Sequence, residues 1–151
     1  KLIISKNPCK LITAYNAGIT KVILPEFDAM MECEQNTPYH MYNVGEHTIK
    51  VMENVSADKL MRWTALFHDV AKPLVKTTDA NGRNHFKGHA LEGSKLAPQI
   101  MHRLKMDNKT IKTASRLIEC HDDRPASKGF NPEAIRRSVH KIGIFIIIIL
   151  N

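Results

Sequence analysis

The middle of the chain carries Ala65-Leu66-Phe67-His68-Asp69-Val70-Ala71-Lys72, an apolar run that ends in a histidine, an aspartate and a lysine. Ser56 or Asp58 can cap a helix that leads into this run, and Pro73 is expected to end it. Side chains three and four positions apart give this helix an inward-facing stripe, which comprises Leu60, Thr64, Phe67 and Ala71.

Other helices are predicted on both sides of this one. Residues 42–55 carry apolar side chains at helical spacing, and His47 lies on the same stripe. A turn is expected at 79–82 within a loop over 77–85, and Asn131-Pro132-Glu133 is a helix start after a polar loop over 122–130. No stretch alternates convincingly as a strand would, so the fold class is all-α, with about six to eight helices. The remaining predicted helices are Pro8 to Gly18, Thr20 to Glu34 with a break at Pro25, Ala90 to Lys105 with a kink or break at Pro98, and Asp107 or Asn108 to Cys120.

The composition is that of a folded domain with a basic surface. The 151 residues are 43% apolar, enough for one hydrophobic core, and 22 Lys and Arg against 15 Asp and Glu give a net charge of +7. A basic surface favours phosphate-bearing partners such as nucleotides or RNA. The three cysteines form no short-spaced pair, which argues against a disulfide framework or a zinc knuckle and fits a reducing cytoplasm.

One domain is expected over 1–151, with a helical lead-in over 1–38, a core over 39–143 and an apolar tail over 144–151. The tail has seven apolar residues, Ile144 to Leu150, against the roughly 20 that span a bilayer. No secretory signal opens the chain, so we predict a cytoplasmic protein without a membrane partner. Because residue 1 is lysine, we expect the chain to be a piece of something longer.

Histidines and aspartates are spread over several of these helices in a pattern that predicts a divalent-metal site. Neutral imidazole and carboxylate are ligands that first-row divalent metals accept. This mixture fits Mn, Fe, Ni, Co or Zn better than Mg. The candidate ligands, in chain order, are His47, His68, Asp69, His89, His121 and Asp122.

Each candidate also has a simpler interpretation. A single histidine on an apolar stripe, such as His47, is more often a core histidine with one hydrogen bond. Asp69 could pair with Lys72 three positions further on, and His85 and His89 could be polar loop residues. We favour the metal site because the simpler interpretations require several separate coincidences. Surface or packing roles are assigned to His40, His102 and His140.

The succession His47, His68-Asp69, His89 and His121 resembles the HD superfamily of metal-dependent phosphohydrolases. Over about residues 8–143 the chain also looks like the middle of bacterial CCA-adding tRNA nucleotidyltransferases of the poly(A) polymerase-like class. The strings that carry this resemblance are Leu24-Pro25-Glu26-Phe27-Asp28, Gln35-Asn36-Thr37-Pro38-Tyr39-His40-Met41-Tyr42-Asn43-Val44-Gly45-Glu46-His47-Thr48, Phe67-His68-Asp69-Val70-Ala71-Lys72-Pro73 and Phe86-Lys87-Gly88-His89-Ala90.

The chain departs from that family in two places. Family members carry an upstream nucleotidyltransferase head with a Gly-Ser motif and a metal-binding pair of aspartates, and this sequence has neither motif. The chain alone is therefore not expected to add nucleotides to tRNA. Family members also continue into an Arg-Ala-Asp segment whose aspartate looks like the last metal ligand. Here Ile144 to Leu150 follow Gly143 instead, and Asp122 is the nearest substitute.

The resemblance implies a metal-dependent phosphohydrolase that acts on phosphomonoesters or phosphodiesters, in nucleotides or 2′,3′-cyclic phosphates. His47, His68 and Asp69 would hold an ion, with Asp122 or water completing its shell. His89 and His121 would hold a second ion or contact the phosphate. The predicted catalytic residues are His68, Asp69 and Lys72, where Lys72 either contacts a phosphate oxygen or is a solvent-exposed lysine at a helix end.

A basic stripe suggests a second function. Lys109, Lys112 and Arg116 recur at helical spacing, with Lys105 near their start, and could follow an RNA backbone or form an ordinary solvated face. The alternative function is thus a non-catalytic helical body that holds tRNA or a partner chain within a larger nucleotidyltransferase. A third hypothesis is a folded remnant of a truncated or frameshifted gene.

Overall fold

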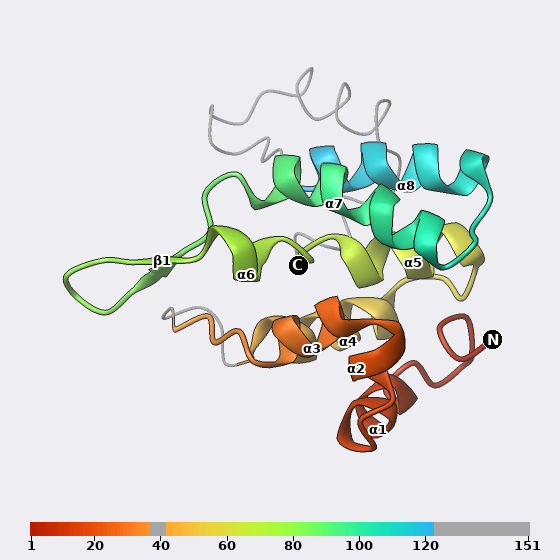
Figure 1. Ribbon diagram of the computed structural model, residues 1–151, viewed down its shortest axis with the longest axis horizontal. Coiled ribbons are helices and arrows are strands. Elements are labelled where there is room, and N and C mark those ends of the chain that lie inside the picture. Colours follow the sequence, from red (N-terminus) through yellow and green to blue (C-terminus); the bar gives the residue numbers. More distant parts are fainter. Residues whose placement is uncertain (37–41, 123–151) are drawn as a thin grey trace.

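The computed structural model describes residues 1–36 and 42–122, and helices dominate them (Figure 1). This architecture confirms the predicted all-α class, apart from one very small hairpin. The elements are α1 (Lys10–Asn16), α2 (Thr20–Ile23), α3 (Pro25–Met31), α4 (Val44–Asn54), α5 (Lys59–Phe67), α6 (Lys72–Val75), β1 (Thr77–Thr78), β2 (Asn84–His85), α7 (His89–Arg103) and α8 (Asn108–Cys120).

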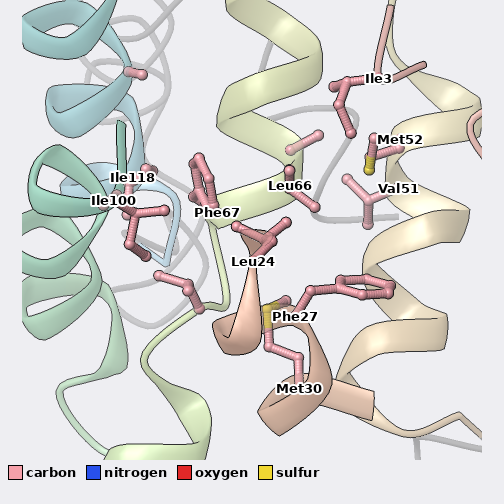
Figure 2. Packing of buried hydrophobic residues seen from close by; sticks show 14 of the residues in the cluster. Ile3, Leu24, Phe27, Met30, Val51, Met52, Leu66, Phe67, Ile100 and Ile118 are labelled. Carbon is pink, nitrogen blue, oxygen red and sulfur yellow. The ribbon is translucent and has the colours of Figure 1, made fainter. Parts of the chain in front are cut away.

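Helix α5 lies at the centre of the packing. It contacts α8, which pairs along its length with α7, and it contacts α4, which in turn packs against α3 (Figure 1). Leu66 and Phe67, at the end of α5, are fully buried. Figure 2 shows Phe67 facing the α7 and α8 side, while Leu66 faces the α4 side. The core side chains labelled around them include Ile100, Ile118, Leu24, Phe27, Met30, Val51 and Met52.

The start of α5 agrees with the sequence, and its end does not. The Asp58 carboxylate caps the helix by accepting from the Met61 N–H at 3.0 Å, while Ser56 hydrogen-bonds to Asp58. The helix stops at Phe67 and does not continue to Pro73, which lies in the first turn of α6, where a missing N–H costs nothing. Tight turns follow Phe67, with the Lys72 N–H donating to the Asp69 carbonyl at 3.0 Å. His68 and Asp69 therefore lie outside the regular part of the helix.

One further expectation is wrong, and one of the two alternatives expected at Pro98 is excluded. A hairpin is present: β1 and β2 pair antiparallel, with Thr77 opposite His85, and strands of two residues are too short to give an alternating pattern. Helix α7 also runs through Pro98 without breaking into two. By contrast, Asp107 caps α8 as predicted, by accepting from the Thr110 N–H at 2.8 Å.

Several expectations concern residues outside the described ranges. They are most of the loop over 122–130, the helix start at Asn131 and the tail from Ile144 to Leu150. None of the helices within residues 1–36 and 42–122 has the length and apolar character needed to span a membrane.

Gly45 allows α4 to approach α3 closely. A Cβ at this position would overlap the Met31 side chain and would lie 3.0 Å from the Met31 Cα. The Val44 N–H donates to the Cys33 carbonyl at 3.0 Å, which joins the same two segments. The start of α4, which carries His47, is thus placed against the end of α3.

We expect Gly45→Ala to lower the free energy of unfolding by about 1–3 kcal/mol, because the clash with Met31 involves backbone as well as side chain. Gly93→Ala is the matched control: the added Cβ would meet Ile118 Cγ2 at 3.3 Å and no backbone atom nearer than 3.7 Å. Chemical denaturation of both variants measures the difference. Equal free energies of unfolding for Gly45→Ala and Gly93→Ala would show that the α3–α4 contact accommodates the added methyl group.

Candidate metal centre

The carboxylate of Asp69 is the centre of the site, and its side chain is only 2% exposed. Its Oδ2 lies 3.2 Å from His68 Nε2 and 3.7 Å from His47 Nε2. Its Oδ1 lies 3.3 Å from His89 Nε2 and 3.6 Å from His121 Nε2. Each carboxylate oxygen therefore faces two imidazole nitrogens.

Four different parts of the fold deliver these imidazoles. His47 lies near the start of α4, and His68 follows directly after α5. His89 is the first residue of α7, and the chain enters that helix through Gly88, whose φ of +83° suits glycine. His121 follows directly after α8. The packing of α4, α5, α7 and α8 thus gathers residues that are up to 74 positions apart in sequence.

Backbone carbonyls fix the orientation of three of these rings. The Nδ1 atoms of His68, His89 and His121 lie 2.7, 2.8 and 2.6 Å from the carbonyl oxygens of Ala65, Phe86 and Ile118. A carbonyl oxygen only accepts, so each Nδ1 must carry the hydrogen and donate it. In a neutral ring this leaves Nε2 with its lone pair directed at Asp69, the arrangement typical of histidine metal ligands.

The imidazole Nε2 atoms of these three rings and the Asp69 oxygens that face them are therefore all acceptors, and no hydrogen atom lies between them to be donated. His89 Nε2 and His121 Nε2 are 3.1 Å apart, and both face Asp69 Oδ1. His68 Nε2 is buried and has no hydrogen-bond partner among the described residues. Lone pairs at such separations repel unless a proton or a metal ion lies between them. Two ligands that lie at right angles about 2.1 Å from one ion would be separated by about 3 Å, so the observed spacing suits a metal.

The ligand atoms form two groups that share Asp69. In the first, named here the His47 group, the members are His47, His68 and Asp69; in the second, the His89 group, they are Asp69, His89 and His121. Within each group the ligand atoms all lie within 4.8 Å of one another. The donor set of imidazole nitrogen and carboxylate oxygen fits a first-row divalent ion in either group.

Neighbouring charges keep Asp69 ionised. Burial acts to raise the pKa of Asp69, but the electrostatic influence of His68 and Lys72 and the contacts with His121 outweigh it and hold this pKa well below its ordinary value. Burial likewise acts to lower the pKa of His89, and its contact with the Asp69 carboxylate outweighs that and raises the pKa. The lowered pKa of Asp69 and the raised pKa of His89 both indicate that the site favours positive charge around the Asp69 carboxylate.

Lys72 belongs to the site and is not a solvent-exposed lysine at a helix end, so that interpretation is wrong. It is only 8% exposed, and its Nζ lies 2.8 Å from Asp69 Oδ2. The same Nζ donates to Gln35 Oε1 at 3.0 Å and lies 5.3 Å from the centre of the Phe86 ring. The pairing of Asp69 with Lys72 at i+3 is therefore real and coexists with the imidazoles. Sequence reasoning missed Gln35, because nothing in a polar stretch signals a contact 37 positions away.

The other candidate residues lie elsewhere. Asp122 is exposed and outside both ligand groups, so its role as a ligand stays a prediction. His85 is also exposed and lies 2.9 Å from Asp79 in the hairpin. His102 is exposed, as expected, whereas His40 and His140 are outside the described residues. The basic residues Lys105, Lys109, Lys112 and Arg116 are all exposed.

Comparison with known proteins places this geometry in a family. Residues 37–142 match the HD domain family. The chain is 32% identical over 117 residues to the A-adding tRNA nucleotidyltransferase of Deinococcus radiodurans, an alignment that covers 74% of this chain and 27% of that protein. It is 31% identical over 113 residues to the CC-adding tRNA nucleotidyltransferase of Thermus thermophilus, covering 71% and 26%.

A third relative is the multifunctional CCA protein of Actinobacillus pleuropneumoniae, which is 27% identical over 136 residues, covering 85% of this chain and 32% of that protein. The chain thus spans about a third or less of the length of these curated relatives. Since the family match extends over well more than half of its length, the chain belongs to the HD domain family.

Proposed function

We propose that this HD domain is a metal-dependent phosphohydrolase that binds two divalent ions and cleaves phosphomonoesters or phosphodiesters, with nucleotides and 2′,3′-cyclic phosphates as the substrate class. The observation that carries the proposal is the set of imidazole Nε2 atoms around the Asp69 carboxylate, three of them oriented by backbone carbonyls. Neutral imidazoles and a shared carboxylate suit two ions held side by side. Water or Asp122 would complete the shell.

A bound divalent ion would supply Lewis acidity, lowering the pKa of a coordinated water and offsetting the negative charge of the phosphate. The chain contributes fixed ligand orientation and a buried carboxylate. Lys72 has three N–H donors, and the contacts with Asp69 and Gln35 use two of them. The third can donate to a phosphate oxygen, which is the catalytic role proposed for Lys72.

The exposure of the ligands indicates from which side a substrate would enter. The side chain of His47 is 25% exposed, whereas those of His68 and Asp69 are 1% and 2% exposed. The His89 group is buried throughout. A phosphate from solvent would therefore reach the His47 group first.

The first prediction concerns metal content. Elemental analysis of the purified chain after incubation with Mn²⁺ or Ni²⁺ should find about two ions per chain, because two ligand groups are present. His89→Ala should lose one ion and Asp69→Asn both, since Asp69 is shared. His102→Ala, an exposed histidine on the same helix as His89, is the matched control and should keep both. Equal metal loss in His102→Ala and His89→Ala would contradict the assignment.

The second prediction concerns hydrolysis. With added Mn²⁺ or Ni²⁺, the chain should release phosphate from nucleoside monophosphates or hydrolyse the cyclic phosphodiester of 2′,3′-cyclic nucleotides. His68→Ala and Asp69→Asn should reduce this rate to the level seen with a chelator, because each removes a ligand. Activity that survives both substitutions would reject the phosphohydrolase.

A second candidate function, binding of tRNA by a non-catalytic helical body, is favoured by a separate observation. Lys109, Lys112 and Arg116 are all exposed along one side of α8, while Ile111 and Ala114 on the opposite side are buried. Two of the relatives named above are tRNA nucleotidyltransferases. Each lysine or arginine that contacts a phosphate contributes affinity that falls with salt.

If this surface binds tRNA, the double substitution Lys109→Glu and Lys112→Glu should weaken binding at least tenfold and flatten its dependence on salt, because two phosphate contacts would be lost. Filter binding between about 50 and 200 mM salt measures both effects. Lys95→Glu, an exposed lysine of α7, is the control. Identical tRNA binding by the double variant and the control would show that this surface does not bind tRNA.

A further inference from the structure

Gln35 is a polar side chain that is buried beside the candidate metal centre. It is 1% exposed and lies in the connection between α3 and α4. Its Oε1 accepts from Lys72 Nζ at 3.0 Å, and its Nε2 donates to the Tyr42 carbonyl at 3.1 Å. An ammonium only donates and a carbonyl only accepts, so these two partners fix which end of the amide faces Lys72. Gln35 is thus held with its acceptor toward the lysine.

The backbone that carries Gln35 is anchored independently of Lys72. On one side, the Glu34 carbonyl accepts from Asn84 Nδ2 at 2.9 Å. On the other, Asn36 Nδ2 donates to the Gly82 carbonyl at 2.6 Å. Contacts to the hairpin on both sides of Gln35 anchor its backbone without help from the lysine, and the Tyr42 carbonyl holds the other end of its amide, so Gln35 can determine where Lys72 lies.

Lys72 and a metal ion would use the same oxygen. Nζ of Lys72 lies 2.8 Å from Asp69 Oδ2, and this is the oxygen that faces His47 and His68. The opposite oxygen, Oδ1, faces His89 and His121. An ion in the His47 group would therefore compete with Lys72 for Oδ2, whereas an ion in the His89 group would use Oδ1.

We propose that Gln35 is a positioning residue of the metal centre, which, by offering Lys72 a second acceptor, keeps Asp69 Oδ2 available to an ion in the His47 group. This inference rests on the proposed function, because it requires that the group binds a metal. Gln35 lies two positions before the segment that matches the HD domain family, so it is contributed by the part of this chain that precedes the match.

Two substitutions should act in opposite directions. Gln35→Met keeps a similar length but removes the acceptor, so the buried ammonium concentrates on Asp69 Oδ2 and metal affinity of the His47 group should fall about 10- to 100-fold, the range for lost outer-shell partners. Gln35→Glu adds a negative charge beside Lys72 and draws it away from Asp69. Affinity of the His47 group should then equal or exceed that of the wild type. The His89 group should change little in either variant.

The test is calorimetric titration of the metal-free full chain with Mn²⁺, with His89→Ala used to assign which binding event belongs to the His47 group. Gln99→Met, an exposed glutamine on α7, is the matched control and should bind as the wild type does. In a Lys72→Met background, Gln35→Met should have no further effect, because the proposed influence passes through the lysine. Circular dichroism checks that each variant is folded.

The outcomes separate the inference from the function on which it rests. Wild-type chain that binds no divalent ion would overturn both. If the wild type binds the ion, three results would overturn only the role of Gln35. They are an unchanged metal affinity in Gln35→Met, an equal shift of the affinity in the same direction in Gln35→Met and Gln35→Glu, and an effect of Gln35→Met that persists in the Lys72→Met background. Should Gln35→Met fail to fold, Gln35→Glu decides alone: weaker binding than in the wild type overturns the proposal.

Discussion

The buried negative charge of Asp69 is the constraint on which the arrangement of this protein depends. A carboxylate removed from water is costly unless positive charge or hydrogen-bond donors surround it. Here Lys72 lies against one oxygen, and imidazoles from four parts of the chain face the two oxygens. The helices α4, α5, α7 and α8 must all be in place for these contacts to exist, so the tertiary packing and the site are established together.

Backbone carbonyls determine which ring nitrogen of these histidines faces Asp69. His68 and His121 follow α5 and α8, where the last carbonyls of a helix have no N–H partner within it. Each of these rings donates from Nδ1 to the carbonyl three residues earlier. The same contact satisfies the end of the helix and leaves Nε2 facing Asp69. The carbonyls at these helix ends therefore gain a hydrogen-bond partner and at the same time orient a candidate ligand.

Much of this could be predicted from the sequence, and the exceptions share a cause. The helices around His47 and His121 follow from apolar spacing and capping residues, and the structure brings His47, His68, Asp69, His89 and His121 together; whether they bind metal remains a prediction. The end of α5 at Phe67 was not predicted, because tertiary contacts and not Pro73 decide it. Gln35 was missed for the same reason. Its partners, Lys72 and Tyr42, are defined by the fold, and no local pattern announces them.

The small hairpin has a consequence for how the chain can vary. Exposed loop tips usually tolerate insertions, because few contacts depend on their length. In this hairpin, Gly82 at the tip accepts from Asn36 and Asn84 donates to Glu34, so the loop holds down a segment from a distant part of the sequence. Lengthening it would shift one of these attachments relative to the other. We therefore regard this hairpin as a spacer of fixed length, poorly suited to accept a tag or an inserted domain.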